Sequence, residues 1–178
     1  MNIRPAVPAD LQQCATLDYD STTDRVWQMD RREDPARGVV TVEFHSVRLP
    51  RTMRNRYPRD PNRLWDDWRK WDLFLIAEED GYMRGYLGLL SVLAEGRVWA
   101  RDLVVGRQFR RNGVGTQLLM NASRWAIEQG AHQLTLEMQS KNYPAIRFCQ
   151  KHGFHFCGYD ENYYPNQDIA LFFVTKLR

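Results

Sequence analysis

The chain has 178 residues, of which 43% are hydrophobic and 26% are charged, and its formal net charge at pH 7 is +3. This composition is typical of a soluble globular protein, and the length suits one domain with a core of its own. The nearly balanced charge gives no indication of a nucleic-acid partner. The longest uncharged apolar stretches reach only about half the length of a membrane span, and the N-terminus lacks the apolar segment of a signal peptide. We therefore expect a cytoplasmic protein with no membrane partner.

The spacing of cysteines and histidines argues against a disulfide framework and against a metal site. The three cysteines, Cys14, Cys149 and Cys157, form no CxxC pair, which argues against a disulfide framework and against a thiolate zinc site. The four histidines show no metal-ligand spacing. The sequence therefore predicts no metal.

The N-terminal part of the chain contains short and interrupted patterns. Residues 3–5 predict a strand, and apolar residues three or four apart over 11–17 predict a helix. Residues 20–24 are typical of a loop, or of the cap of a second short helix carrying Val26, Trp27 and Met29. Pro35 then marks a turn.

The next segment is basic. Alternation over 39–49 predicts a half-buried strand, residues 50–63 predict an Arg- and Pro-rich surface connection, and residues 62–71 have helical spacing. The arginines between Arg48 and Arg63 suit a solvated loop, or else a clamp for a ribose phosphate or an acidic partner.

The second part of the chain has clearer patterns, which give the following elements in order. They are strands over 73–77, 82–93 and 98–105, a helix over 114–129, a strand over 133–139, a helix from Pro144 to His152, and strands over 154–163 and 169–175. The order predicts a mixed α/β fold in which antiparallel hairpins precede a β-α-β-α-β-β tail.

One loop has the properties of an anion site. The run Arg110-Arg111-Asn112-Gly113-Val114-Gly115-Thr116 lies between the strand ending at Val105 and the long helix. Unpaired amides at a helix N-terminus and the helix dipole attract anions, and the two glycines allow a ligand to approach the backbone closely. Arg110 and Arg111 add mobile positive charge. The loop is neither a Walker A loop nor GxGxxG, since Leu118 occupies the place of the third glycine. A pyrophosphate is the expected ligand.

The motif Arg110-x-x-Gly113-x-Gly115 resembles the acyl-CoA-binding signature of the GNAT superfamily of N-acetyltransferases. A second conserved block of that family is matched downstream by Leu136-Glu137-Met138-Gln139, Asn142, Ala145, Phe148 and Gly153-Phe154. The resemblance covers residues 73–178, whereas residues 1–72 match only in general layout. The run 136–139 and the tail from Tyr164 to Phe173 are most similar to the streptothricin acetyltransferases.

The resemblance implies a GNAT-like fold: a twisted mixed sheet, flanked by helices and splayed between the parallel strands 98–105 and 133–139. It implies one acetyltransferase domain over 1–178, with an acceptor-side half (1–72) and an acetyl-CoA-binding half (73–178). Acetyl-CoA would lie in the split as co-substrate. The resemblance assigns its pantetheine to the main chain near Leu103, Val104 and Val105 and to Asn142, and its pyrophosphate to the loop 110–116.

Two carboxylates are candidates for the general base that must deprotonate the attacking amine. Glu137 occupies the position where relatives keep this base, and we expect its side chain to face the split. Asp102, at the end of the other central strand, is the second candidate. The alternative for each is an ion pair or hydrogen bond that only fixes a strand.

Cys149 stands where relatives commonly have a tyrosine that protonates the coenzyme thiolate. The thiol is short for that task, so a buried packing role is favoured over a general acid. Tyr143 or Tyr164 are alternative donors, and water is another.

The acceptor is expected to lie over the N-terminal half. Residues suited to a cationic amine, by charge or by cation–π contact, are Trp27, Glu43, Asp66, Asp67, Trp68 and Tyr164. Tryptophans at helical spacing are also typical of a core.

The predicted function is acetyl transfer from acetyl-CoA to a primary amine of a small, antibiotic- or polyamine-like cation, by direct attack. One alternative is an N-terminal or lysine amine of a protein. Another is an acyl-CoA-binding regulatory module without turnover. The sequence leaves open a monomer or a homodimer.

Overall fold

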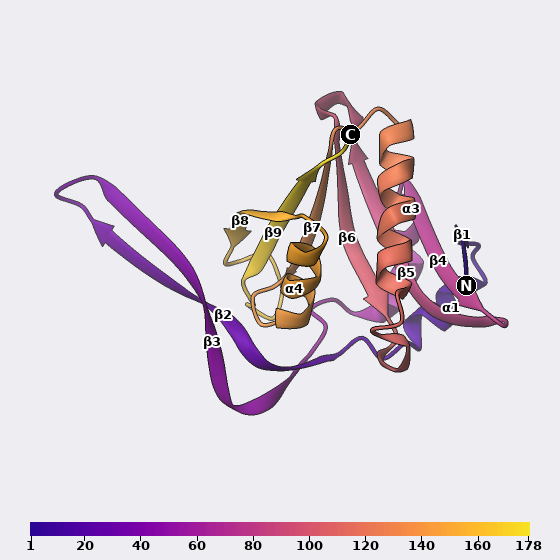
Figure 1. Ribbon diagram of the computed structural model, residues 1–178, viewed down its shortest axis with the longest axis horizontal. Coiled ribbons are helices and arrows are strands. Elements are labelled where there is room, and N and C mark those ends of the chain that lie inside the picture. Colours follow the sequence, from indigo (N-terminus) through magenta and orange to yellow (C-terminus); the bar gives the residue numbers. More distant parts are fainter.

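The computed structural model describes residues 1–178, which form a seven-stranded sheet and a separate two-stranded ribbon (Figure 1). The strand order in the sheet is β1-β4-β5-β6-β7-β9-β8. Its strands are β1 (Asn2–Pro5), β4 (Leu73–Glu79), β5 (Tyr82–Val92), β6 (Arg97–Val105), β7 (Gln133–Gln139), β8 (His155–Asp160) and β9 (Ala170–Lys176). The ribbon consists of β2 (Ser21–Asp34) and β3 (Val39–Asn55). The α-helices are α1 (Asp10–Ala15), α2 (Leu64–Asp67), α3 (Val114–Glu128) and α4 (Tyr143–Lys151).

The sheet opens between its two parallel strands, β6 and β7. They pair only from Arg97 opposite Gln133 to Ala100 opposite Leu136. Beyond Ala100, β6 continues to pair with β5 alone, and β7 with β9 alone. Figure 1 shows the two strands close together at one end and apart at the other. The predicted mixed sheet, splayed between two parallel strands, is confirmed. We refer to the opening as the split.

An irregularity in β6 lies at the start of the split. Leu89 of β5 faces Ala100, whereas the preceding Gly88 faces Asp102, so Arg101 is an extra residue on β6. Such a β-bulge bends the strand and changes the direction of its main-chain groups. The bend is located where β6 leaves β7.

Two apolar clusters hold the sheet on its opposite faces. Helix α3 contacts β4, β5 and β6 through buried residues such as Leu118 and Ala122. A second cluster, which includes Leu11 of α1, Leu64 of α2 and Tyr86 of β5, lies on the other face. Burial of each large apolar side chain stabilises the fold by about 1.5–3 kcal/mol. None of the helices combines the length and apolar character needed to cross a bilayer.

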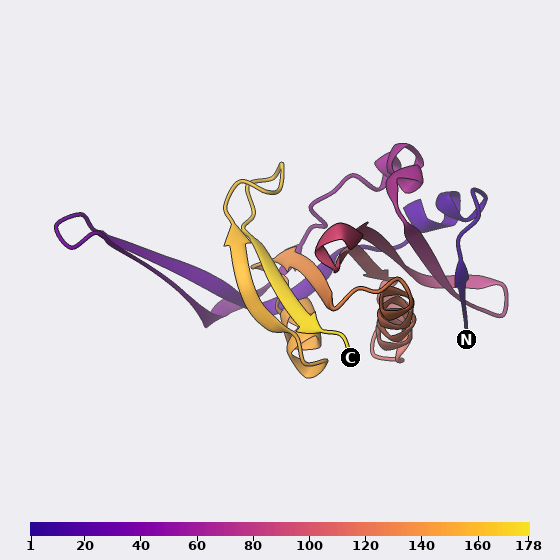
Figure 2. The same ribbon diagram turned by 90° about the horizontal axis from the view of Figure 1, so that it is seen from above.

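The β2–β3 ribbon is the main departure from the predicted elements. It extends away from the sheet (Figure 2), and its ladder runs from Ser21 opposite Asn55 to Asp34 opposite Val39. Both alternatives for residues 20–24, a loop or the cap of a short helix carrying Trp27, are therefore wrong: the strand begins at Ser21. The Trp27 ring packs against Phe44 across the ribbon and against Phe173 of β9, so tertiary contacts decide the conformation here.

Two further boundaries differ. Strand β3 continues to Asn55, so the first part of the predicted connection 50–63 is strand. The helical spacing over 62–71 corresponds to a four-residue α2 between two 3₁₀ turns, Pro61–Arg63 and Trp68–Lys70. The other helices and strands lie within a few residues of their predicted positions.

Candidate active site

A pocket lies where β6 and β7 separate, and several segments of the chain line it. Residues 57–59, which follow the ribbon, cover it on one side. Leu103 of β6 and Glu137 of β7 lie along its walls. Asn142, the N-cap of α4, and Cys149 of α4 border it, as does Tyr164. The pocket thus brings together residues that the sequence places far apart.

Glu137 lines this pocket, and Asp102 lies between its lining residues Arg101 and Leu103 in β6; both carboxylates are buried. The Asp102 side chain is 4% exposed and that of Glu137 is fully buried. The Arg59 guanidinium bridges them: its Nη1 donates to Asp102 Oδ1 at 3.1 Å, and its Nη2 donates to Glu137 Oε1. Nη1 also lies 3.0 Å from the carbonyl oxygen of Arg101, which faces the split. Glu137 therefore faces the split as expected, but as part of an ion pair.

Three tyrosines complete this cluster. The Tyr57 hydroxyl donates to Asp102, and the Tyr163 hydroxyl donates to Glu137 Oε2 at 2.6 Å. The ring of Tyr164, which is buried, lies 5.4 Å from the Arg59 guanidinium carbon. Burial raises the pKa of the Tyr164 hydroxyl well above its usual value. The cluster thus combines two acids, a cation and aromatic rings.

The two carboxylates differ in how they suit proton transfer. Burial raises the pKa of Asp102 to about 7. A general base works best when its pKa is near the operating pH. Asp102 accepts from Arg59 and Tyr57, whereas Glu137 accepts from Arg59 and Tyr163 and also has Arg101 Nε at 3.8 Å from its Oε2. These contacts suit Glu137 to binding and orientation.

The loop 110–116 has the geometry of an anion site. Helix α3 begins at Val114, and both Arg111 (φ 69°) and Gly113 (φ 81°) have left-handed backbone conformations. No main-chain amide of residues 111–116 donates a main-chain hydrogen bond. Six consecutive N–H groups, together with the helix dipole, are thus free for an anion.

The two arginines of this loop behave differently. Arg110 is fixed, not mobile as expected: its Nε donates to the carbonyl of Val105 at 2.9 Å, and its Nη1 donates to that of Asp20 at 2.8 Å. Burial lowers the pKa of this guanidinium. Arg111 is exposed and supplies the accessible charge.

Cys149 has the surroundings of a packing residue. Its side chain is buried on α4, and its Sγ lies 3.8 Å from Met138 Sδ. Burial raises the pKa of its thiol to about 12, which makes it a weak proton donor.

We expect Cys149→Ala to reduce turnover by only a few fold and the free energy of unfolding by about 1 kcal/mol, because it removes one small buried group. Steady-state kinetics and denaturant unfolding measure the two effects. Cys14→Ala is the matched control, since Cys14 is a fully buried thiol in the other cluster. A well-folded Cys149→Ala enzyme with about 100-fold slower turnover would instead identify a general acid.

Most predicted acceptor residues lie outside the split. Trp27 packs in the ribbon, Glu43 is exposed on β3, and Trp68 packs against the cluster around α1. Asp66 is exposed and Asp67 pairs with Lys70 at 2.5 Å. Of this set, only Tyr164 borders the pocket.

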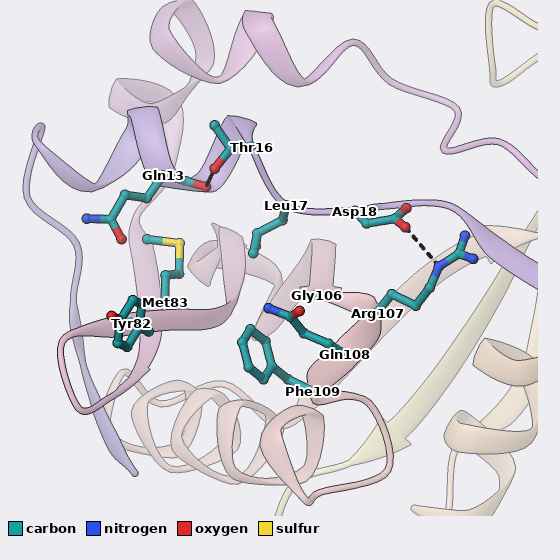
Figure 3. A pocket seen from close by; sticks show the side chains of 10 residues that line it. All are labelled: Gln13, Thr16, Leu17, Asp18, Tyr82, Met83, Gly106, Arg107, Gln108 and Phe109. Atoms are coloured by element: carbon teal, nitrogen blue, oxygen red, sulfur yellow. Dashed lines mark hydrogen bonds and ion pairs between the residues drawn. The ribbon is translucent and has the colours of Figure 1, made fainter.

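A larger cavity of about 510 Å³ lies elsewhere, between α1, the β4–β5 turn and residues 106–109 (Figure 3). Its charged residues, Asp18 and Arg107, pair with each other at 2.8 Å. It contains none of the groups of the split, so we place the chemistry in the smaller pocket. No group of three or more His, Cys, Asp or Glu side chains is arranged to hold a metal ion.

The sequence did not single out Tyr57, Arg59, Arg101 or Tyr163 individually. Arg101 and Tyr163 adjoin the predicted Asp102 and Tyr164, and that adjacency was the available signal. Arg59 belongs to an irregular connection, where spacing carries no information about direction.

Comparisons with known proteins agree with this arrangement. A family model described as "Acetyltransferase (GNAT) family" matches residues 20–154. Streptothricin acetyltransferase of Streptomyces lavendulae is 28% identical over 167 residues, which are 90% of this chain and 85% of that protein. The crystal structure of nourseothricin acetyltransferase superimposes with a TM-score of 0.82, at 25% identity, over 99% of this chain and 98% of that one.

Two further proteins are similar to this chain in structure or in sequence. A Bacillus anthracis protein, provisionally named a streptothricin acetyltransferase and solved in complex with acetyl coenzyme A, has a TM-score of 0.76 at 20% identity, over 98% of each chain. A peptidyl-lysine N-acetyltransferase of Escherichia coli is 36% identical over 80 residues, 45% of this chain and 48% of that protein.

Proposed function

Because the chain belongs to the GNAT family of acetyltransferases, we propose that it transfers the acetyl group of acetyl-CoA to a primary amine of a small cationic molecule, of streptothricin type. One observation carries this proposal: two buried carboxylates, Asp102 and Glu137, meet at the split in the sheet. A buried pair of acids needs a cation beside it, and a protonated amine is such a cation.

The acetyl-CoA site is supported by the loop and by the open edge of β6. The free amides of residues 111–116 suit the pyrophosphate, with Arg111 as the exposed charge. The unpaired edge of β6 near Leu103 suits the amide groups of pantetheine, which can pair with it as a strand would. The acetyl-CoA complex of the Bacillus anthracis relative is consistent with this placement.

The proposed chemistry is direct attack. The acceptor ammonium loses a proton to Asp102, and its nitrogen lone pair then attacks the thioester carbonyl carbon. A main-chain N–H of β6 near Leu103 stabilises the oxyanion. The carbon–sulfur bond breaks, the attacking nitrogen gives up its second proton, and that proton reaches the thiolate through Tyr164 or water, while Glu137 holds the acceptor's remaining charge. With Cys149 buried, catalysis depends largely on positioning and on Asp102.

A protein amine is the second candidate acceptor, and the lysine-acetylating relative from Escherichia coli favours it. The narrow pocket, with Glu137 and the rings of Tyr57 and Tyr164 in its lining, argues for a small cation. The alternative of a regulatory module rests on Cys149 in place of the usual tyrosine.

An acceptor panel tests the proposal. We expect CoA thiol to be released fastest with a streptothricin, more slowly with spermidine, and least with peptides that offer an N-terminal or lysine amine. A preference for peptides would transfer the function to protein acetylation. Acetyl-CoA binding without thiol release for any amine would favour the regulatory module.

A further inference from the structure

The Arg59 side chain extends into the split from an irregular connection between β3 and α2. Its guanidinium is 23% exposed and reaches Asp102, Glu137 and the Arg101 carbonyl at the same time. It also lies over the ring of Tyr164. Acids, an aromatic face and a main-chain acceptor all converge on this one cation.

Little space remains beside this guanidinium. The cavity that is left has a volume of about 70 Å³, room for a few water molecules. Sites for small ligands typically occupy about 300–1,000 Å³. An amine nitrogen that is to contact both carboxylates must therefore take the place that the Arg59 guanidinium now occupies.

The charges around the split are balanced only through Arg59. Arg59 pairs with both Asp102 and Glu137, whereas Arg101 Nε lies 3.8 Å from Glu137 Oε2. Withdrawal of Arg59 leaves Asp102 without a cationic partner and Glu137 with Arg101 alone. A protonated amine would restore this balance and could use the same oxygen atoms and the same ring.

Building on the proposed function, we propose that Arg59 is an internal substitute for the acceptor's ammonium group, and that a cationic acceptor displaces it on binding. The acceptor must then compete with a tethered guanidinium. Amines with several positive charges gain most in that competition, so Arg59 selects for them against simple monoamines.

The connection that carries Arg59 is short and attached at its ends. Before it, Asn55 Nδ2 donates to Gln139 Oε1 at 3.0 Å; after it, the Asp60 side chain caps the next 3₁₀ turn. Arg59 itself lies between these attachments, without helix or strand hydrogen bonds. Its side chain can therefore withdraw while the ribbon and α2 stay in place.

The test uses the guanidinium ion as a probe of the site in an Arg59→Ala variant. At low millimolar guanidinium chloride, with sodium chloride of equal ionic strength as reference, the melting temperature of Arg59→Ala should rise. The wild-type protein should show no such rise, because its site is filled. Arg69→Ala is the matched control, since Arg69 is exposed on the turn after α2; it should behave as wild type.

If Arg59→Ala does not fold, Arg59→Gln is measured in the same way, because its amide still donates one hydrogen bond. Folding of either variant only with guanidinium present would support the proposal. A folded variant without a guanidinium response would overturn it, and so would failure of both to fold even with the ion.

Kinetics provide an independent readout. The KM for butylamine should fall about tenfold in Arg59→Ala with kcat maintained, and the KM for spermidine should fall less. A large loss of kcat would make Arg59 a positioning residue and overturn the proposal. If no amine is acetylated by either protein while guanidinium still stabilises Arg59→Ala, the proposed function fails and the cation site stands.

Discussion

At neutral pH, Asp102→Asn should lower kcat by about 10²–10⁴-fold, the usual contribution of a general base. Asparagine keeps the shape of the side chain and still accepts from Tyr57, but it cannot take the proton of the acceptor ammonium. Steady-state kinetics with saturating acetyl-CoA measure the effect. Asp10→Asn is the matched control, since Asp10 is also buried and paired with an arginine, Arg4 at 2.7 Å, but lies on α1 away from the split.

The pH dependence gives a second check on Asp102. The pKa of this carboxyl is raised to about 7, so the wild-type rate should fall as the pH drops through that value, and the variant should lack this limb. The rate should rise with pH, whereas the stability should fall. The native state holds the proton of Asp102 more tightly than the unfolded state, so the free energy of unfolding decreases as the pH rises from about 4 to the folded pKa. The Asp102→Asn variant should be flatter over this range. Unchanged kcat in this variant, with a loss in Glu137→Gln, would return the role to Glu137.

Local patterns predicted the parts of the fold whose conformation depends on near neighbours. The spacing of Leu118 and Ala122 reports a helix that buries one face, and α3 starts at Val114 as expected. Trp27 shows the limit of this reasoning. Its local sequence predicted a short helix, but contacts with Phe44 and Phe173, which are distant in the sequence, hold it in a strand.

The same distinction applies to the site. The loop 110–116 could be inferred because its glycines and its helix N-terminus are adjacent in the chain. Asp102 and Glu137 could be proposed singly, since each lies on a predicted central strand. That one arginine bridges them could not be inferred, because Arg59 is brought to the split by contacts between distant parts of the chain, such as that of Asn55 with Gln139 of β7.

Arg110 has a different role in the structure from the one that its place in the motif predicted. Its position in the motif indicated a mobile charge, yet the structure uses it to tie the loop to the carbonyls of Val105 and Asp20. The loop thus gains rigidity, and its positive potential comes from main-chain amides and Arg111. Anion binding at such a loop depends on backbone conformation more than on side-chain charge.

Gly113→Val should therefore abolish most of the stabilisation by acetyl-CoA, which is about 2.7 kcal/mol at a ligand concentration 100 times the Kd. The φ of 81° at this residue strongly disfavours a β-branched side chain, although no atom lies within 4 Å of the added Cβ. The loop must then change conformation, and its amides no longer converge. Thermal unfolding with acetyl-CoA and with S-acetylpantetheine, which lacks the pyrophosphate, measures the effect; only the response to acetyl-CoA should be lost.

Gly38→Val separates loss of the anion site from backbone strain in general. Gly38 has a φ of 64°, also with no atom within 4 Å of an added Cβ, but it lies in the turn between β2 and β3. Both variants should lose about 1–3 kcal/mol of unfolding free energy from strain, the usual cost of such a conformation. Only Gly113→Val should lose its response to acetyl-CoA, because only that turn orients free amides toward the coenzyme. If acetyl-CoA stabilised both variants equally, the pyrophosphate would bind away from residues 110–116.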